Sequence, residues 1–348
     1  MWADRRALAA WDSWRAISSL EDVTAAEVPV LAAAYRRLRR LGAEDPMLSI
    51  ARGIYRRTWY LNQLGLRRAA TVVAELRAAG IEVLVMKGAA LALLYHRDLG
   101  ARPMQDLDLL VGPDRLAGAV ETLAASGWQA LSTQGMVNGP LRYATHVEDE
   151  NENEVDLHAY ALLQSVDDSD LWETRVPLLL IDTPTHALAP AEQLIHVCTH
   201  GMRWDGLMIR WAIDAMTILR AAGDQLDWAR LVERSRARRL TVAVGAALGW
   251  LRQSLDADIP GSVLDDLNAG PRLRFERTVH KMQARPPTSL RLAIMSLDRY
   301  RRFAKLAPAG ERPRSLAEYL RTAWELDRGT DVLRHGSRKL AVRARAYQ

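Results

Sequence analysis

The spacing of hydrophobic residues changes twice along the chain. Up to about residue 78 apolar residues recur with the 3.6-residue period of amphipathic helices, and Gly80 provides a stop for the last of them. From Ile81 short apolar runs alternate with single helix-like segments, which is typical of an α/β unit. From Pro190 onward the helical spacing returns. The pattern predicts an α+β protein with a small mixed β-sheet core flanked by N-terminal and C-terminal helical lobes.

The same pattern sets domain limits and elements. We expect a helical lobe over 1–78, an α/β core over 79–185, and a helical bundle over 186–348 that ends in a basic tail from His335. Strands are predicted at 81–86, 107–111, 128–131, 142–148, 153–159 and 178–182, and helices at 88–97 and 113–126. The polar stretch 149–153 predicts a tight hairpin turn, which would return residue 156 to the strand that begins at 107.

Composition excludes several classes of protein. The 348 residues include 47 basic and 42 acidic ones, and this net charge of +5 does not by itself indicate a nucleic-acid partner. The single cysteine, Cys198, excludes an internal disulfide framework and a cysteine-rich zinc module. No apolar run reaches the roughly 20 residues of a membrane span, and the first residues lack the apolar segment of a secretory signal. We therefore expect a cytoplasmic protein with no membrane association.

Three acidic residues carry the chemical signal of the sequence. Asp106 and Asp108 flank a leucine at the head of a predicted strand, so their side chains project from the same side of it. Two carboxylates this close repel each other and lose hydration unless a cation offsets the cost. Asp156 lies in another predicted strand. Three carboxylates on adjacent strands predict an all-oxygen Mg²⁺ site of the kind used in phosphate chemistry.

A lysine precedes these acids. The basic residues are almost all arginines, and the four lysines are Lys87, Lys281, Lys305 and Lys339. Lys87 directly follows the apolar run 81–86, where its compact charge suits a phosphate; the alternative is that it ends the strand in solvent. The chain contains no G-x-x-x-x-G-K-[ST], G-x-G-x-x-G or H-E-x-x-H motif.

Taken together, these segments resemble a known family. The run LVMKGAALALLYHRDLGARPMQDLDLLV (84–111) and the later VDLH (155–158) are similar to the signature of the uncharacterised bacterial nucleotidyltransferases of the polymerase-β-like superfamily. The resemblance spans roughly residues 60 to 220 and includes the patterns at 196–201 and 211–214. Nucleotidyltransferase toxins are more distantly similar. The wider superfamily has Gly-Gly or Gly-Ser at the turn, where this chain has Gly88-Ala89.

The resemblance implies a metal site at the three acids. Two Mg²⁺ ions would clamp the attacking and leaving oxygens around the α-phosphorus of an NTP. Asp106 and Asp108 would bind both ions, and Asp156 would bind the ion that activates the acceptor hydroxyl and help to take its proton. His158 would orient Asp156 or contact the nucleotide, with a satisfied core histidine as the alternative.

It also implies a nucleotide site beside the metals. Lys87 and Arg102 would neutralise the phosphates, Arg102 as a bidentate fork. Gly88 would allow the backbone to approach the triphosphate, and the backbone N–H groups at Gly88-Ala89 would hold the anion.

Further candidates lie in the C-terminal helices. His196 and His200 are one helical turn apart, a spacing that suits either zinc or a polar patch that lines the nucleotide cleft. Asp214 lies within an apolar helix and requires a partner, in a structural ion pair or in the cleft. Arginine pairs such as Arg36-Arg37 are most simply solvated helix faces.

These residues predict a nucleotidyltransferase that moves an NMP from an NTP to a hydroxyl and releases pyrophosphate. A small molecule or biosynthetic intermediate is favoured as the acceptor, because no continuous basic stripe for nucleic acid is evident in the sequence. Transfer to tRNA or to a protein is the alternative within enzymes. A catalytically silent nucleotide-binding scaffold is the alternative outside them, although a scaffold has no need of three clustered acids.

Overall fold

The computed structural model describes most of the chain. The described residues are 2–19, 21, 23–130, 144–162, 165, 167–201, 209–269, 274–283, 288–306, 312–323, 326, 328 and 331. The predicted strand residues 131 and 142–143 and the predicted basic tail lie outside them.

The structure confirms the predicted α+β class, with helices on both sides of one mixed sheet. The longer helices are α1 (Trp2–Arg15), α2 (Val28–Arg40), α3 (Met47–Ala78), α5 (Leu116–Ala125), α7 (Pro190–Gly201), α8 (Arg210–Ala222), α9 (Trp228–Ala237), α10 (Thr241–Leu255), α11 (Gly261–Ala269), α12 (Arg274–Gln283), α13 (Ser289–Leu306) and α14 (Leu316–Ala323). The strands are β1 (Leu84–Val85), β2 (Leu107–Leu110), β3 (Gln129–Ala130), β4 (Ala144–Glu148), β5 (Glu154–His158), β6 (Val176–Leu180) and β7 (Thr183–Ala187). The short helices α4 (Lys87–Ala90) and α6 (Ser169–Glu173) complete the core.

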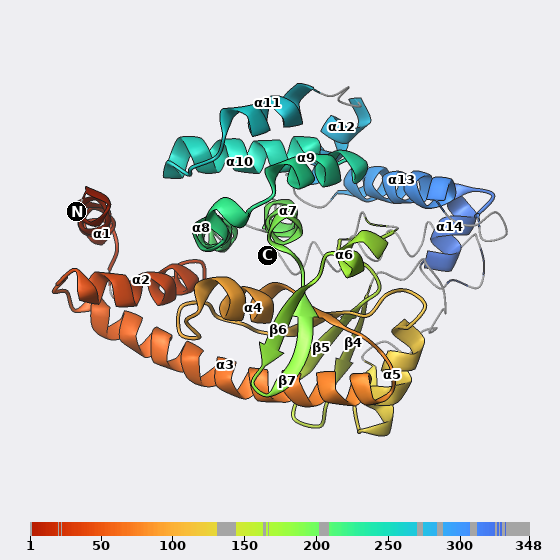
Figure 1. Cartoon of the computed structure of the whole chain (residues 1–348), viewed down its shortest axis with the longest axis horizontal. Helices are drawn as coiled ribbons and strands as arrows, with labels where there is room; N and C mark the ends of the chain where they lie inside the picture. The colour runs from red at the N-terminus through yellow and green to blue at the C-terminus, as the bar shows by residue number, and fades with distance from the viewer. Residues whose placement is uncertain are drawn as a thin grey trace.

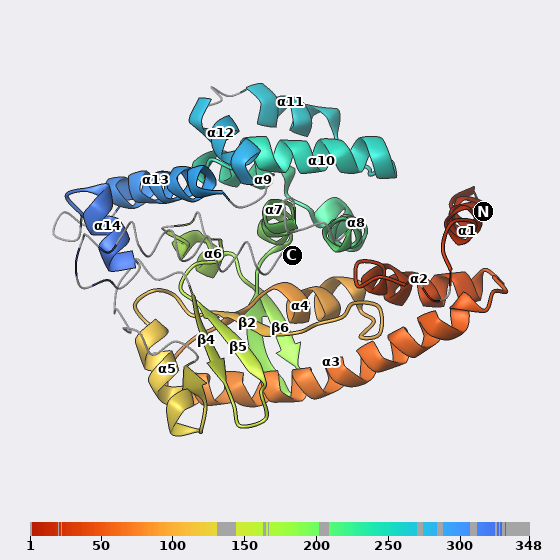
Figure 2. The same ribbon diagram turned by 180° about the vertical axis from the view of Figure 1, so that it is seen from behind.

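The sheet has the strand order β3-β4-β5-β2-β1-β7-β6. Strand β2 runs parallel to β5 and antiparallel to β1, while β4 and β5 form an antiparallel hairpin. Figure 1 shows α3 and α5 on one side of the sheet and the C-terminal helices α7–α13 on the other, and Figure 2 gives the same arrangement from behind. The central pair β2–β5 therefore lies between two helical layers.

The turn between β4 and β5 forms as the polar stretch predicted. Asp149 accepts hydrogen bonds from the backbone N–H groups of Asn151 (2.9 Å) and Asn153 (3.0 Å), and the intervening Glu152 adopts a left-handed conformation at φ 59°. An aspartate that bonds to backbone N–H groups beyond it is typical of such turns. The hairpin brings β5 back beside β2.

Helix α3 contributes to two hydrophobic cores. Its second half, from Leu66 to Leu76, is buried in the cluster that includes the sheet and α5. Its first turns, Met47–Ala51, pack in a separate cluster with α1 and α2. Because one continuous helix belongs to both clusters, the domain limit after residue 78 remains a prediction.

Two features differ from the predicted elements. Strand β7 was not predicted, because its sequence TPTHA is polar and contains Pro184. The proline is tolerated because β1 pairs only with His186 and Ala187, so Pro184 faces β6 alone. The predicted helix 88–97 is α4 followed by a π-helical segment, Leu91–His96. None of the helices in the described ranges combines the length and apolarity that a membrane span requires.

Candidate functional site

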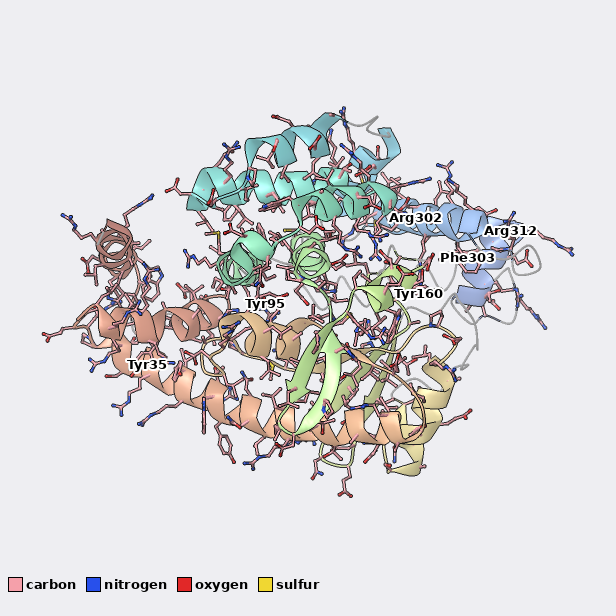
Figure 3. All side chains as sticks on the ribbon, in the orientation of Figure 1. Tyr35, Tyr95, Tyr160, Arg302, Phe303 and Arg312 are labelled. Carbon is pink, nitrogen blue, oxygen red and sulfur yellow. The ribbon has the colours of Figure 1, made fainter. Side chains whose placement is uncertain are left out.

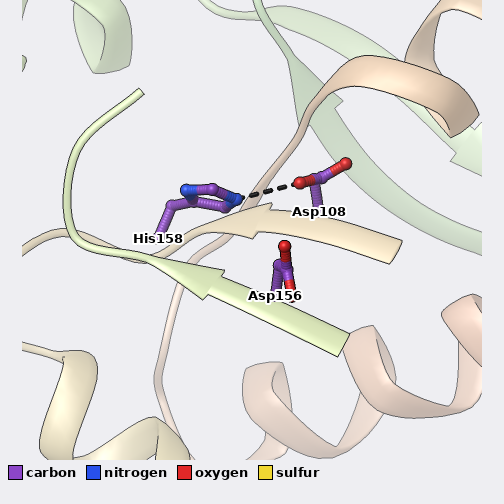
Figure 4. A group of neighbouring side chains, drawn as sticks. All are labelled: Asp108, Asp156 and His158. Atoms are coloured by element: carbon purple, nitrogen blue, oxygen red, sulfur yellow. Dashed lines mark hydrogen bonds and ion pairs between the residues drawn. The ribbon is translucent and has the colours of Figure 1, made fainter. Parts of the chain in front are cut away.

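Two of the predicted acids lie side by side across the centre of the sheet. Asp108 of β2 and Asp156 of β5 are direct Cα partners in the parallel register, so their side chains leave the same face. Both are buried, with 1% and 7% of their surface exposed. His158, two residues after Asp156, extends its Nε2 to 2.9 Å from Oδ1 of Asp108 (Figure 4). One ligand atom from each of these three residues lies within 4.8 Å of the others.

Lys87 also contacts this group. Its Nζ donates to Oδ1 of Asp108, the oxygen that His158 contacts. Lys87 has a φ of 44°, a left-handed conformation that costs a non-glycine residue roughly 1–2 kcal/mol. Burial opposes ionisation of Asp108, but the hydrogen bond from His158 and the charge of Lys87 outweigh it and lower its pKa. Asp108 is therefore held as a carboxylate.

Asp106 lies just outside this group. It precedes β2, is exposed, and lines the same cavity as Lys87 and Asp108. Its partial burial and then the negative charge of Asp108 raise its pKa. Asp106 and Asp108 thus face the repulsion expected from their spacing; Lys87 and His158 contact Asp108 directly, while the charge of Lys87 only partly offsets the raised pKa of Asp106.

Asp156 has a partner that the sequence analysis missed. Nδ1 of His146, which is opposite Asp156 in the β4–β5 register, contacts Oδ1 of Asp156. His146 is exposed, and the hydrogen bond with Asp156 raises its pKa. The alternation of the sequence around His146 indicated a strand but not its register, so the pair could not be found before the hairpin was aligned.

A cavity of about 310 Å³ opens beside these acids. The core contributes the Lys87-Gly88 turn, the segment 102–106 and Asp108 to its wall. The C-terminal helices α7 and α8 contribute the other wall, which comprises His196, Val197, His200, Gly201, Arg210, Trp211 and Asp214. The cavity therefore lies between the sheet and the C-terminal helices.

Arg102 joins these two walls. Its guanidinium forms a bidentate pair with Asp214 of α8, with Nε 2.9 Å from Oδ1 and Nη2 3.1 Å from Oδ2. His96 adds a third contact to Asp214 at 2.9 Å. Burial opposes ionisation of Asp214, but Arg102 and His96 outweigh it and lower its pKa. Asp214 thus has both of the roles that the sequence left open, a buried ion pair and a place in the cavity wall.

The position of Arg102 explains why residue 88 is a glycine. A Cβ at Gly88 would lie 2.9 Å from Nη1 of Arg102 and 3.1 Å from Cγ of Met104, so a side chain there would displace the arginine. Asn62 of α3 fixes the Arg102 segment by donating to the carbonyl of Arg102 at 2.8 Å. Ala89, in contrast, is 3% exposed and packs in the core of the sheet. Of the predicted nucleotide-binding positions, Lys87, Gly88 and Arg102 line the cavity.

Arg210, like His146, was not singled out from the sequence. It begins α8 and lines the cavity. Burial and then the charge of Arg102 lower its pKa, while Asp214, Asp106 and Asp108 oppose this effect. Among the described residues no carboxylate lies within ion-pair distance of it. Arg210 is one of many arginines in the sequence, and only the packing of α8 against the core distinguishes it.

The two histidines of α7 also line the cavity. His196 is buried, its Nε2 lies 3.1 Å from the carbonyl oxygen of Ala161, and burial lowers its pKa well below the usual value. His200 stacks on it with ring centroids 5.7 Å apart. Within the described ranges, one group of side chains is arranged to hold a metal ion, and it consists of Asp108, Asp156 and His158. His196 and His200 do not belong to it, so the alternative that they bind zinc has no support.

The donor set at the sheet fits a divalent cation. Asp108 and Asp156 present carboxylate oxygens from neighbouring strands, which Mg²⁺ and Mn²⁺ prefer, and His158 adds an imidazole that Mn²⁺ also accepts. The cluster attracts cationic groups already, since Lys87 contacts Asp108 and His146 contacts Asp156. The acidic residues of the sheet therefore lie beside a cavity that is lined in part by basic residues.

The strand–lysine–glycine turn and the acids of β2 and β5 lie in the segments that resemble the nucleotidyltransferase signature in the sequence. The chain belongs to the family described as uncharacterised nucleotidyltransferase, whose model matches residues 23–256. No curated protein matches the chain. Among solved structures, the chain is similar to an antigenic nucleotidyltransferase-like protein from Paracoccidioides brasiliensis, with 16% identity, a TM-score of 0.37, and coverage of 58% of this chain and 93% of that one. Family membership, rather than this distant structural likeness, supports nucleotidyl transfer in general.

Proposed function

We propose that the protein transfers an NMP group from an NTP to an acceptor hydroxyl and releases pyrophosphate. The observation that carries the proposal is the pairing of Asp108 with Asp156 across β2–β5, beside a cavity bordered by Lys87 and Arg102. Nucleotidyl transfer requires carboxylates near the α-phosphorus and cationic groups near the β- and γ-phosphates. The cavity offers both, because Asp108, Lys87 and Arg102 border it on the side of the core and Arg210 borders it on the side of α8.

Asp106, Asp108 and Asp156 are the residues that would hold two Mg²⁺ ions. The bound ions would lower the pKa of the acceptor hydroxyl and neutralise charge on the transferred phosphate. Asp108 is already ionised and oriented by His158. Asp156, which contacts the solvent-exposed His146, would receive the proton of the hydroxyl.

The cationic groups divide into two kinds. Lys87 is bonded to Asp108, and two nitrogens of Arg102 are bonded to Asp214, so the charge of each is partly compensated within the protein. Arg210 has no such pair among the described residues and faces the acids across the cavity. We infer that Arg210 meets the charge of the triphosphate, while Nη1 of Arg102 and the turn at Gly88-Ala89 position it.

The acceptor and the cellular location belong to the same proposal. A cavity of about 310 Å³, which Asp106 helps to line, has room for the phosphates of an NTP. A small hydroxyl-bearing molecule is the acceptor favoured by the sequence, in a cytoplasmic setting where NTPs are available.

Incubation with α-labelled NTPs tests the proposal. Each NTP is supplied with Mg²⁺ or Mn²⁺ and with either a small-metabolite fraction or an RNA fraction of cell extract, and label transfer and pyrophosphate are measured. The expected result is label transfer by the wild type and by Asp114→Asn, an exposed aspartate remote from the acids, and none by Asp108→Asn. Equal transfer by wild type and Asp108→Asn would contradict the proposal. Mn²⁺ binding, followed by electron paramagnetic resonance without any NTP, should be lost in the same variant.

A further inference from the structure

Helix α3 exposes an unusually basic side to solvent. Over 32 residues it carries six arginines and a single acidic residue, Glu75. All six are exposed; Arg77 donates to the carbonyl of Pro184, and the other five are Arg52, Arg56, Arg57, Arg67 and Arg68. Figure 3 shows nitrogen-tipped side chains that project from the outer side of α3, away from the sheet. The outer side of α3 is therefore a concentrated positive surface on a chain whose net charge is only +5.

None of these five arginines forms an ion pair in the described part of the chain, although the charge of Arg68 acts on Asp149 in the β4–β5 turn. The ion pairs of the N-terminal helices involve other arginines, such as Arg15 with Asp45 and Arg36 with Asp98. Helix α2, packed beside α3, adds exposed Arg39 and Arg40 and contains no acidic residue. From the sequence alone, such arginine pairs are most simply ordinary solvated helix faces. A solvated face normally mixes both signs of charge, and this one does not.

Two exposed aromatic residues lie among the arginines of α3. Trp59 is 47% exposed and Tyr60 is 58% exposed, and at about 100° per residue both project from the same half of the helix as Arg52, Arg56 and Arg67. Exposed aromatic rings among arginines offer flat faces on which unpaired bases can stack. From Arg52 to Arg68 the surface extends about 24 Å along the helix axis.

From this juxtaposition we infer that the outer face of α3 binds a single-stranded stretch of nucleic acid. The arginines contact successive phosphates, and Trp59 and Tyr60 stack on unpaired bases between them. Asn62, on the buried side of the same helix, holds the Arg102 segment of the cavity, so the surface lies on the side of α3 opposite the cavity. The inference goes beyond the proposed transfer reaction and does not depend on it.

A membrane is a weaker match for this surface. A helix that binds a lipid surface presents an apolar face along its length. The apolar face of α3 is already buried, its first turns against α1 and α2 and its second half against the sheet. The exposed apolar residues of α3 are confined to the turn Trp59–Leu61. Charge complementarity and the central aromatic pair therefore favour an unpaired polynucleotide.

Fluorescence anisotropy of the full chain, without NTP or metal, tests the inference. The probes are a single-stranded RNA, a single-stranded DNA and a duplex, with polyglutamate and anionic phosphatidylserine vesicles as non-nucleotide polyanions. We expect the single strands to bind, with about a hundred-fold loss of affinity between 50 and 200 mM salt for five phosphate contacts. Preference for RNA over DNA would identify contacts to the 2′-hydroxyl, and equal binding would restrict the contacts to the backbone and bases.

Two pairs of variants locate the binding. Arg56→Gln/Arg67→Gln should weaken single-strand binding about tenfold or more, while Arg220→Gln/Arg252→Gln, which removes the same charge from exposed positions of α8 and α10, should not. Trp59→Ala should cost about fivefold or more. Circular dichroism confirms that each variant remains folded. The inference is overturned if the α3 variants bind as wild type, if Trp59→Ala has no effect, or if duplex, polyglutamate or vesicles bind as tightly as the single strands.

Discussion

Asp108 lies directly opposite Asp156 in the parallel register of β2 and β5, and both carboxylates are buried on one face of the sheet. Neither residue is near the other in sequence, and the hairpin through Asp149–Asn153 is what brings them together. The acidic group is therefore a consequence of strand topology. The burial of each acid determines how a substitution there will change the free energy of unfolding.

Neutralising Asp106 and neutralising Asp108 should have opposite effects on stability. Asp108→Asn leaves Lys87 and His158 without their shared carboxylate in a buried place, so it should lower the free energy of unfolding by about 3–5 kcal/mol. Asp106→Asn removes an exposed charge that Asp108 repels, so the stability should be unchanged or slightly higher. Urea unfolding in metal-free buffer measures both. Equal destabilisation by the two variants would contradict the assigned pairing.

Replacing Arg210 should weaken NTP binding without unfolding the protein. Arg210→Ala removes a cavity cation that has no ion pair among the described residues, so we expect roughly tenfold to hundredfold weaker binding of an unreactive NTP analogue with Mg²⁺. Arg220→Ala is the matched control, because Arg220 is exposed near the other end of the same helix. Calorimetric titration distinguishes the two. Similar affinities for both variants would remove Arg210 from the binding site.

The buried Arg102–Asp214 pair should show strong coupling. Arg102→Met and Asp214→Leu each leave a buried charge without its partner and should each lower the free energy of unfolding by about 3–5 kcal/mol. The double variant should lose less than the sum of the two, by about 1–3 kcal/mol. A complete double-mutant cycle by urea unfolding measures this difference. Strict additivity would mean that the two residues act independently, contrary to their bidentate geometry.

Asp168 predicts a pH dependence of stability. Its carboxyl is 6% exposed, and burial raises its pKa to about 6 although Arg238 lies 3.1 Å away. In the unfolded chain its pKa is about 4. Between about pH 4 and pH 6 the folded protein holds a proton that the unfolded chain has released. The contribution of Asp168 is therefore fully present below pH 4 and is lost as the pH rises to 6, by at most about 1.4 kcal/mol per pH unit.

Asp168→Asn should remove this dependence. The difference in free energy of unfolding between wild type and variant should shrink as the pH rises from 4 to 6, and the exposed-site variant Asp114→Asn should follow the wild type. Unfolding in urea at pH 4, 5 and 6 provides the measurement. A constant difference between wild type and Asp168→Asn would show that the carboxyl titrates at its usual pKa.

The sequence predicted the α+β class and much of the geometry around the acids, because both follow from local patterns. The pattern placed Asp108 and Asp156 on strands, the polar turn predicted the β4–β5 hairpin, and β5 of that hairpin pairs with β2. The features that the sequence did not predict depend on long-range packing. Strand β7 has a polar sequence whose place in the sheet depends on β1 and β6, and the His146–Asp156 contact depends on register.

Most of the other features that the sequence did not predict involve the C-terminal helices. Asp214 was recognised as needing a partner, but only the docking of α8 shows that the partner is Arg102. The same docking brings Arg210 to the cavity. The basic face of α3 was hidden because its arginines are spaced by helical turns and become one surface only when the helix is formed and its other side is buried.

The most direct test of the central claim compares NTP affinity and pyrophosphate release in wild type and Asp156→Asn. The variant retains Asp106 and Asp108, so it should bind Mg²⁺ and NTP within a few-fold of wild type. Its pyrophosphate release with acceptor present should fall by at least roughly a hundredfold, because the variant lacks the carboxylate that we propose as the acceptor of the hydroxyl proton. Pyrophosphate release by Asp156→Asn at the wild-type rate, or none by the wild type with any NTP and acceptor fraction, would contradict the account.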